Sequence, residues 1–515
     1  MTPPLPLPPG RERARQLLFP GAPFRMQPRI DRALADPDLQ RFVPATTLLK
    51  DHAREAALAA AFGPRVDELR RLAGAIKDHT LAHLDQYLAQ LFAVADVNGV
   101  HIHLAPDAEA ARSAILAIAT RIGAKTAVKA KSMVTEEIQL LDALVAAGIE
   151  TWETDLGELV LQLDDDAPSH IVTPMIHKDR TAAGRAFARR LGLPETSDPE
   201  TLTRYARAHL REAFLAADLG ITGANFLVAA TGEIVLCTNE GNGRLSSAAP
   251  PVHVAVAGIE KLVPTLEHLG VFLELLAKSS TGQPLTVYTS FVARTRQADE
   301  SDGESDGESG GLRDREIAGN LAPGSDADPS RAFAKEIHLI LLDAGRSSIL
   351  ADPTFREALR CIRCGACLNT CPVYRVIGGH AYGSVYPGPI GAVLTPLLRG
   401  PAATPDLPWA STLCGACRPA CPVDIDLPGL LVAHRARAVR TDRHQRKLPR
   451  LLAFVMGGRR RWRVAGKVLA RQRAPGAKSG WDVAGRRQMQ PADSRPFHAR
   501  WKLLAPSLTK RGGSR

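Results

Sequence analysis

The pattern of apolar and polar positions divides the chain into a helical start, an alternating middle and an irregular end. Residues 40–95 carry apolar positions at helical spacing, as in A-A-L-A-A-A-F and D-E-L-R-R-L-A-G-A-I-K, which predicts helices. Strands are then expected at 99–105 and 125–130, and helices at 108–123 and 135–148. The segments G-I-E-T-W-E-T-D and S-H-I-V-T-P-M-I continue this alternation, which is typical of a mostly parallel sheet covered by helices.

The second half of this region predicts a hairpin and then a break. Residues 225–239 read as two strands that turn at Thr231-Gly232, and V-H-V-A-V-A-G and L-T-V-Y-T-S-F-V supply further strands around a helix at 258–278. Residues 296–330, with E-S-D-G-E-S-D-G-E-S-G-G, hold too few apolar residues to fold and predict a disordered acidic insertion. The apolar strand 335–343 is expected to return to the same sheet.

Composition places the chain among ordinary globular proteins of two or three domains. It has 515 residues, of which 45% are hydrophobic and 23% charged. No apolar run approaches the roughly 18–20 residues that span a bilayer. Prolines interrupt the start, M-T-P-P-L-P-L-P-P-G, where a signal peptide needs an apolar helix. We therefore expect residues 1–39 to be the disordered or extended start of a cytoplasmic protein.

The positive charge is concentrated at the end of the chain. The net charge is +11, but residues 431–515 hold 23 Lys and Arg against 3 Asp and no Glu. Residues 436–515 therefore form a basic tail on a mildly acidic body. Alternating basic and apolar residues suit docking to an acidic partner or to the chain itself, and next an anionic membrane surface. Nucleic acid is not expected, because the tail has no recognisable reading motif.

Seven of the eight cysteines fall within residues 361–421, in two runs that match cysteine for cysteine except at Ser411. The first run, C-I-R-C-G-A-C-L-N-T-C-P, is the bacterial ferredoxin pattern, in which three close thiolates hold one cluster and the fourth reaches the other. This crossed pairing predicts two [4Fe–4S] clusters. Cluster one takes Cys361, Cys364, Cys367 and Cys421, and cluster two takes Cys371, Cys414 and Cys417.

Other interpretations of the cysteines are less well matched. Paired C-x2-C knuckles also hold zinc, but a third cysteine at the same interval and the following proline are not usual there. Disulfides fit least, because the cysteines are few and clustered. Ser411 is interpreted as capping the helix that carries Cys414 and Cys417, with iron ligation as the alternative. Cys237 is expected to be a small core residue.

Several polar groups outside the cysteine runs are candidates for binding. Anion binding at a strand-to-helix turn competes with helix capping from Thr135; the residues concerned are Lys129, Lys131, Ser132, Glu136 and Glu137. N-E-G-N-G-R, with Glu240 and Arg244, shapes either a pocket or a turn. The histidines show no metal-ligand spacing; they are His101, His103, His170, His177 and His380. No G-x-G-x-x-G supports flavin or nicotinamide binding, and no nucleophile–base constellation is evident.

Longer stretches resemble a known family. Residues 372–398 and the following L-P-W-A-S-T-L-C-G-A-C closely resemble the lactate utilisation protein B family, while 129–137, 220–234 and 239–244 are similar to its LUD domain. The resemblance covers roughly residues 40–450. It implies that a serine in the second cysteine run is a family trait. The acidic insertion departs from the family pattern.

The resemblance implies a fold, a division into domains and a function. The expected fold is α/β, with a LUD domain of the NagB/RpiA/CoA-transferase-like kind at 40–345 and a mainly helical two-cluster ferredoxin-type module at 346–435. The implied function is electron transfer between partner subunits during oxidation of L-lactate to pyruvate. Two alternatives remain: the iron–sulfur subunit of a glycolate- or heterodisulfide-type oxidoreductase, or a LUD-domain enzyme that acts on a small anion itself.

Overall fold

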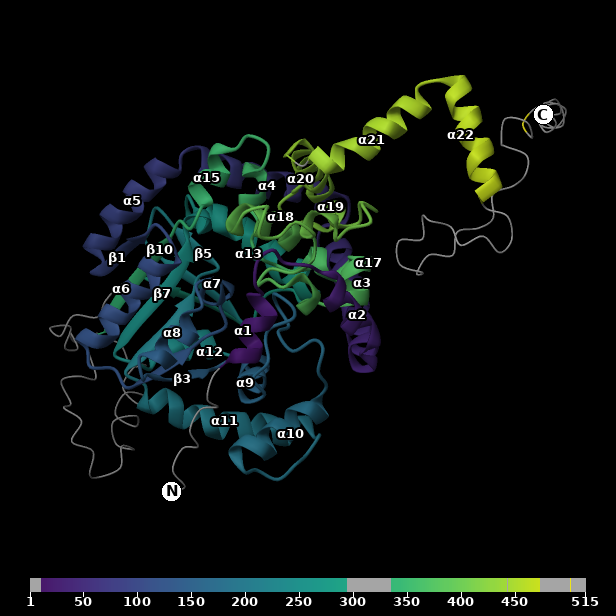
Figure 1. Cartoon of the computed structure of the whole chain (residues 1–515). Coiled ribbons are helices and arrows are strands. Elements are labelled where there is room, and N and C mark those ends of the chain that lie inside the picture. The colour runs from purple at the N-terminus through teal and green to yellow at the C-terminus, as the bar shows by residue number, and fades with distance from the viewer. Residues whose placement is uncertain (1–10, 294–334, 442, 473–500, 502–515) are drawn as a thin grey trace, which may run out of the picture. The chain divides into compact units, whose positions relative to one another are not determined.

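The computed structural model describes residues 11–293, 335–441, 443–472 and 501 (Figure 1). The chain divides into two compact units, residues 1–435 and residues 436–515. The α/β region and the cysteine module share the first unit. The acidic insertion expected at 296–330 lies outside the described residues.

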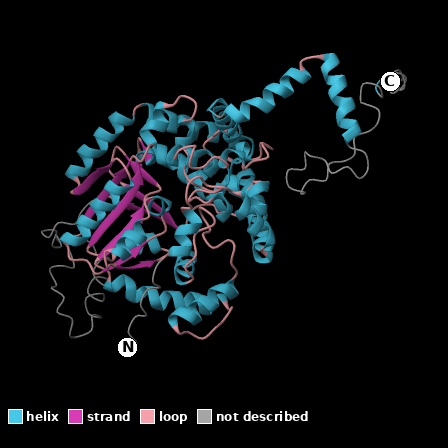
Figure 2. Cartoon of the chain, viewed as in Figure 1, coloured by secondary structure: helices cyan, strands magenta, loops and turns pink. Residues whose placement is uncertain are grey.

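Six parallel strands form a sheet in the α/β part of the first unit (Figure 2). Its strand order is β1-β10-β7-β4-β2-β3. The bounds are β1 Val100–Ala105, β10 Glu336–Leu342, β7 Val252–Gly258, β4 Leu219–Gly223, β2 Thr126–Lys129 and β3 Glu150–Glu153. The expected parallel sheet is confirmed, and β10 returns to it between β1 and β7.

Both faces of this sheet are covered, and β10 shows how its residues alternate between them. Ile340 and Leu342 pack with α6 (Ala108–Arg121) and α8 (Leu140–Ala146), whereas Leu339 and Leu341 pack with α5 (Leu84–Val97) and a second sheet. A strand buried on both faces needs a continuous apolar run. The sequence H-L-I-L-L of β10 supplies it.

The second sheet has the order β8-β5-β6-β9 and contains the expected hairpin. Its strands are β8 Leu262–Val263, β5 Phe226–Val228, β6 Ile234–Thr238 and β9 Tyr288–Val292. Antiparallel β5 and β6 turn at Gly232, whose φ of 74° suits glycine. The helix expected at 258–278 begins only at Leu266, because the residues before it form β8, and α13 runs Leu266–Thr281.

Two other expected elements are corrected. The helix expected at 135–148 is two helices, α7 (Met133–Glu137) and α8, because Gln139 takes a left-handed φ of 51°. The S-H-I-V-T-P-M-I segment is a loop and no strand; Tyr374 Oη donates to the Ser169 carbonyl at 2.6 Å. Beyond β3 follow α9 (Leu156–Leu163), α10 (Arg180–Leu191), α11 (Pro199–Ala216) and, after β6, α12 (Asn242–Ala248).

The expectation of a disordered or extended N-terminus is wrong for residues 11–39. They form α1 (Glu12–Leu18), α2 (Gln27–Ala35) and the start of α3 (Pro37–Phe62), with Phe24 and Met26 buried. The Phe24 amide donates to the Ala403 carbonyl at 2.8 Å. The physical reason is that the proline-rich run ends at residue 9, and the apolar residues after it bury against the cysteine module. The helices α4 (Val66–Ala82) and α5 follow.

The cysteine module is built from short helices, as expected. They are α15 Arg346–Ala351, α16 Ala366–Asn369, α17 Pro372–Ile377, α18 Gly388–Arg399, α19 Cys417–Ala420 and α20 Leu427–Thr441. Its core is continuous with that of α3 and α13. The module therefore packs directly on the helices that precede and cover the sheets.

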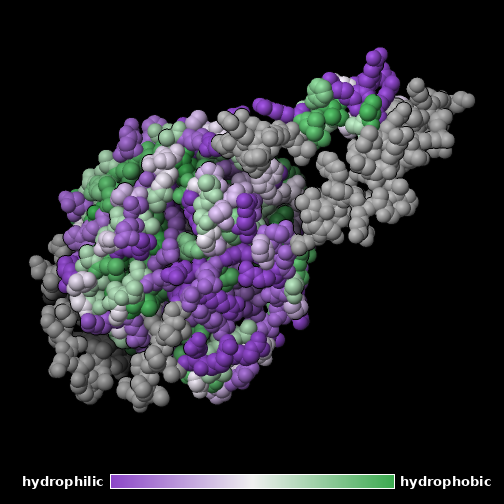
Figure 3. Space-filling view, in the orientation of Figure 1, coloured by the Kyte–Doolittle hydropathy of each residue, from purple (hydrophilic) through white to green (hydrophobic). Residues whose placement is uncertain are grey.

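The described part of the second unit includes the end of α20, α21 (Arg443–Met456) and α22 (Arg459–Gln472). Phe454, Met456 and Trp462 are exposed among arginines, and Figure 3 shows apolar and hydrophilic side chains together on this segment. No helix within the described ranges is both long and apolar enough to cross a membrane.

Candidate metal centre and adjoining cavity

The two cysteine runs meet where helices α16 and α19 pack together. Cys367 lies in α16, Cys417 begins α19 and Cys421 follows its last residue. Between the first cysteines, Arg363 and Gly365 take positive φ values of 63° and 76°, which bend the backbone tightly. The turn gives the first run the close spacing that a shared cluster requires.

Two sulfurs accept backbone hydrogen bonds. Cys371 Sγ accepts from the Tyr374 amide at 3.5 Å, and Cys421 Sγ accepts from the Ile425 amide at 3.4 Å. In each case the proline after the cysteine turns the chain so that later amides point back at the sulfur. Such bonds favour the thiolate and help to set the potential of a cluster.

The sulfurs influence one another in two main groups. Burial raises the pKa of Cys364, with Cys421 and Cys361 adding to it, and burial and Cys361 raise the pKa of Cys421 to about 12. Burial also raises the pKa values of Cys371 and Cys417, where Cys414 contributes to both. Weaker effects link the groups: Cys417 contributes to the raised pKa of Cys367, and Cys421 contributes to the raised pKa of Cys417. Buried thiols of this kind need a positive partner to ionise, as iron would provide.

The spacing of the sulfurs is not that of a mononuclear zinc site. Among the seven cysteines, all of which lie in described segments, no three sulfurs lie within 4.8 Å of one another. A tetrahedral Zn²⁺ with bonds of about 2.3 Å would hold its sulfurs about 3.8 Å apart. The donor set, seven cysteines in two ferredoxin-type runs, fits iron–sulfur clusters instead.

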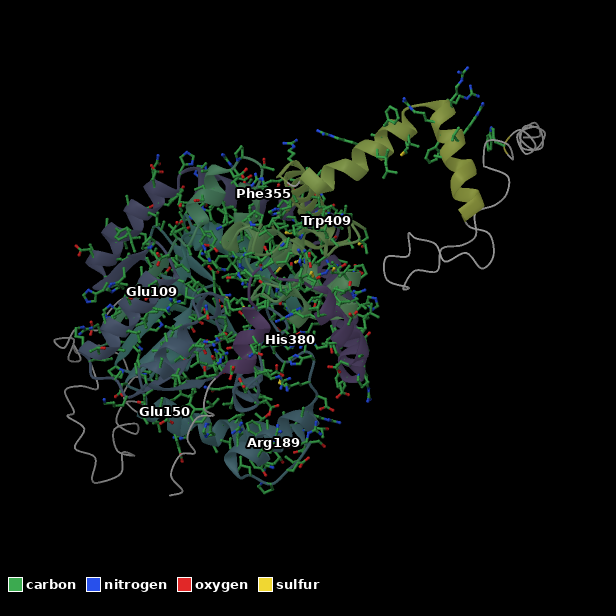
Figure 4. The ribbon with its side chains drawn as sticks, in the orientation of Figure 1. Glu109, Glu150, Arg189, Phe355, His380 and Trp409 are labelled. Carbon is green, nitrogen blue, oxygen red and sulfur yellow. The ribbon has the colours of Figure 1, made fainter. Side chains whose placement is uncertain are left out.

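The two groups differ in exposure. Cys364, Cys367 and Cys421 are buried and Cys361 is partly buried, whereas Cys414 is exposed. Near Cys414, Trp409 is 46% exposed and the Arg435 guanidinium lies 5.0 Å from its ring centre (Figure 4). Cys371 and Cys417 are buried as well, so Cys414 is the exposed member of the seven.

Ser411 does not cap a helix, so that interpretation is wrong. Its hydroxyl accepts the Leu413 amide at 3.1 Å, while α19 begins six residues later and is preceded by Ala416. Leu413 takes a positive φ of 55°. The serine thus stabilises the tight turn that leads into Cys414.

Helix α4 holds the second cysteine run in place. Arg70 Nε donates to the Cys421 carbonyl and its Nη2 to the Arg418 carbonyl, both at 2.7 Å. Arg360, next to Cys361, pairs with Asp78 of the same helix at 2.6 Å. One helix of the N-terminal region therefore positions both runs.

A cavity of about 240 Å³ adjoins the first run. On one side it is lined where β2, β4 and β7 end, by Ala130, Gly223 and Gly258. On the other side it is lined by Arg363 and Cys364. It thus lies at the carboxyl ends of parallel strands, where α/β proteins bind ligands.

Charged side chains hold the wall of this cavity together. Glu260 accepts Arg346 Nε at 2.7 Å and Arg363 Nη2 at 3.3 Å. Burial alone would raise the pKa of Glu260, but Arg346 and Arg363 lower it to about 2. Burial lowers the pKa of Lys261 to about 8, and Arg363 adds to this. Burial and Asp155 raise the pKa of Glu240 to about 6.

Comparison with known proteins agrees with this arrangement. Residues 88–311 match the LUD domain family and residues 357–425 match the 4Fe–4S dicluster domain family. Lactate utilization protein B of Shouchella clausii is 46% identical over 393 residues, which are 76% of this chain and 75% of that protein. The chain belongs to the lactate utilisation protein B family.

Two further similarities extend the comparison. "Uncharacterized electron transport protein YkgF" of Escherichia coli is 46% identical over 369 residues, 72% of this chain and 71% of that protein. A solved DUF162 family protein from Deinococcus radiodurans is similar at 13% identity, covering 50% of this chain and 98% of its own, with a TM-score of 0.25. This last similarity is too low to bear on the fold.

The candidate anion-binding residues of the LUD domain separate into two sets. Lys129 is fully buried and binds Glu153, Glu136 and Glu158 at 2.8, 3.3 and 3.8 Å, so its role is structural. Only Lys131 and Ser132 line the cavity, and Ser132 also caps α7.

Among the other candidate residues, some are paired with other side chains and some line the cavity. Glu137 binds Arg346 at 2.9 Å and accepts from Tyr386 Oη at 2.6 Å. Glu240 lines the cavity but exposed Arg244 does not, and Cys237 is partly buried, packs against the core and also lines the cavity.

The histidines have structural partners. His103 Nε2 lies 3.0 Å from His338 Nδ1, and His170 Nε2 lies 3.1 Å from Asn369 Oδ1. His177 and His380, the latter marked in Figure 4, lie beside Asp166, and their ligand atoms lie within 4.8 Å of one another. The negative charge of Asp166 in that group is already paired with a cation, because Lys178 Nζ lies 2.9 Å from its carboxylate.

Sequence reasoning missed the cationic residues contributed by the module and by the turn that precedes β8. Arg363 lies inside the first cysteine run, and Arg346 and Lys261 lie in segments without a motif. A positive φ at Arg363 is a three-dimensional property and gives no pattern. Only the fold brings these residues together.

Proposed function

We propose that the chain is an iron–sulfur electron-transfer protein that takes part in the oxidation of L-lactate to pyruvate and carries electrons between partner subunits. The observation that carries the proposal is the juxtaposition of seven cysteine sulfurs in two groups, within a 4Fe–4S dicluster domain. The relatives named lactate utilization protein B support the assignment to lactate oxidation. We further propose two [4Fe–4S] clusters, held as the crossed pairing predicts, in a cytoplasmic protein, because thiolate ligands persist in a reducing compartment.

The residues of this chain have defined tasks in that function. Bound clusters would supply one-electron transfer. Cys361, Cys364, Cys367 and Cys421 would hold the first, in a site that excludes water because three of the four side chains are buried. Arg70 fixes the backbone around Cys421.

Two surfaces would meet the partner subunits. One surrounds exposed Cys414, where Trp409 and Leu413 are also exposed. The other is the basic second unit, where the Arg461 guanidinium lies 4.0 Å from the Phe454 ring centre and both apolar and cationic groups are available. A partner with an acidic surface fits best, and an anionic membrane surface is the alternative.

Growth of a deletion strain tests the pathway. A strain lacking the chain should fail to grow on L-lactate but should grow on glycolate. The wild-type chain and Cys237→Ala should restore growth, and Cys364→Ala should not. Normal growth of the deletion strain on L-lactate would overturn the proposal, and failure on glycolate alone would favour a glycolate system.

A measurement on the purified chain tests the carrier role. The chain alone should reduce no acceptor when L-lactate is added anaerobically, and should do so when its partner subunits are added. Turnover of L-lactate by the chain alone would show that it is an enzyme in its own right.

A further inference from the structure

The cavity beside the first cysteine run contains buried polar atoms that have no partner. Arg363 Nη1, Thr238 Oγ1 and Ser280 Oγ are buried and make no hydrogen bond within the described part of the chain. All three residues line the cavity. Buried donors without partners are unfavourable, and a charged group more so. Three such residues around one cavity are explained if a ligand accepts their hydrogen bonds.

The charged side chains around Arg363 favour the binding of an anion. Lys261 and Arg363 both line the cavity, and the Lys261 ammonium makes no hydrogen bond or ion pair with any described residue. Glu260 is the carboxylate beside them, and it is shared between Arg346 and Arg363. Among these side chains positive charge is left over, and the Cys361 sulfur is the other group that raises the pKa of both cations. A buried cation favours an opposite charge within a few ångströms.

The size of the cavity and its other wall narrow the class of anion. A volume of about 240 Å³ is smaller than the roughly 300–1,000 Å³ of sites for drug-sized ligands, which favours a small anion. Asp155 and Glu240 form a second charged wall of the cavity, near Lys131. Their carboxylates oppose a second negative charge on the ligand. A short molecule with one carboxylate and a hydroxyl or carbonyl group matches both walls.

We propose that this cavity binds a small monocarboxylate, with its carboxylate at Arg363 and Lys261 and its polar tail towards Glu240. Thr238 and Ser280 donate hydrogen bonds from their hydroxyls. The site lies beside Cys364, so ligand binding changes the surroundings of the first cysteine group. The proposed function enters only in the choice of L-lactate and pyruvate as probes; the site itself follows from the geometry.

Calorimetric titration of the anaerobically purified holoprotein with L-lactate, pyruvate and inorganic phosphate tests the site. One of the two carboxylates should bind, and phosphate should bind at least about tenfold more weakly. Lys261→Met should weaken binding about tenfold or more, Lys261→Arg should restore most of it, and Thr238→Val should weaken it severalfold. Lys335→Met is the matched control. This partly buried lysine precedes β10 at the amino end of the strand, whereas the cavity lies at the carboxyl ends of the strands.

The outcomes separate this inference from the proposed function. Absence of carboxylate binding, tighter binding of phosphate, or equal binding by Lys261→Met, Thr238→Val and wild type would each overturn the site. None of these results would alter the iron content or the growth test, which bear on electron transfer. Electron paramagnetic resonance gives a second readout: saturating carboxylate should shift the signal that Cys364→Ala removes and leave the other signal unchanged.

Discussion

The Arg363 guanidinium lies 3.3 Å from Oε1 of Glu260, so a residue between two cysteines of the first run is tied to the end of the parallel sheet. Glu260 also binds Arg346 Nε at 2.7 Å, and Arg346 continues to Glu137 at 2.9 Å. Buried charges of this kind fix geometry because breaking one contact leaves an unpaired charge. The cysteine loop and the cavity wall are therefore one connected structure.

The crossed pairing predicts which substitutions damage the same cluster. Cys421→Ala should remove the signal that Cys364→Ala removes, although Cys421 belongs to the second run. Cys371→Ala should remove the signal that Cys417→Ala removes. The reason is that the fourth thiolate of each run reaches the other cluster. Electron paramagnetic resonance of the reduced variants measures this.

Cys237 provides the control for these cysteine substitutions. Cys237→Ala should leave both signals intact, because this thiol lies in β6, outside both cysteine runs. If Cys371→Ala instead destroyed the cluster held by Cys364, each run would hold its own cluster and the crossed pairing would be wrong.

Ser411→Ala should leave cluster two nearly unchanged. The hydroxyl accepts the Leu413 amide in a partly exposed turn, so its loss should cost at most about 1 kcal/mol. Cys414→Ala should damage the same cluster, because it removes one of three thiolates. Spectra of the two variants decide between turn stabilisation and ligation: conversion to a three-iron signal in Ser411→Ala would show that the serine is a ligand.

Lys129→Met should destabilise the LUD domain strongly. Burial lowers the pKa of Lys129, but Glu153, Glu158 and Glu136 outweigh it and raise the pKa. Without the ammonium these carboxylates are left buried with too little positive charge, at a cost of about 3–5 kcal/mol.

Urea unfolding followed by circular dichroism measures that effect as a lower midpoint. Lys125→Met is the control, since this exposed lysine precedes the same strand and its loss should cost less than about 0.5 kcal/mol. Equal midpoints for the two variants would contradict a structural role for Lys129.

Local patterns were sufficient to predict the parallel sheet, the β5–β6 hairpin and the packing of the two cysteine runs against each other. An apolar run such as β10 or a Thr-Gly turn is specified by adjacent residues. The packing of α1 and α2 was missed, because short helices stabilised by distant contacts leave little periodicity. Ser411 was misplaced because a serine before a turn and a serine before a helix look alike in sequence.

The residues that line the cavity could not be predicted from the sequence, because the fold brings them together. Lys131 and Glu240 were singled out from sequence, but nothing marked Lys261, Arg346 or Arg363, which come from separate segments. Conversely, Lys129 looked like a ligand residue because burial and pairing are not visible in sequence. Long-range contacts decide which charges are neutralised and which remain available.

Carboxylate binding should depend on pH through Glu240. Burial and Asp155 raise the pKa of Glu240 to about 6, while Lys131 lowers it. Below pH 6 the side chain is neutral, and above it a negative charge faces the ligand, so affinity should fall as the pH rises from about 5 to 7. Calorimetry across this range measures the change. Glu240→Gln should flatten the profile, and a profile unchanged by the substitution would exclude Glu240 as its cause.

Iron and acid-labile sulfide analysis of the anaerobically purified chain, with zinc measured in parallel, tests the central claim most directly. Two cubane clusters predict about eight irons and eight sulfides per chain, or about seven irons if the three-cysteine site loses one. Cys364→Ala and Cys417→Ala should each lower the iron content by about half. Stoichiometric zinc with little iron would contradict the account.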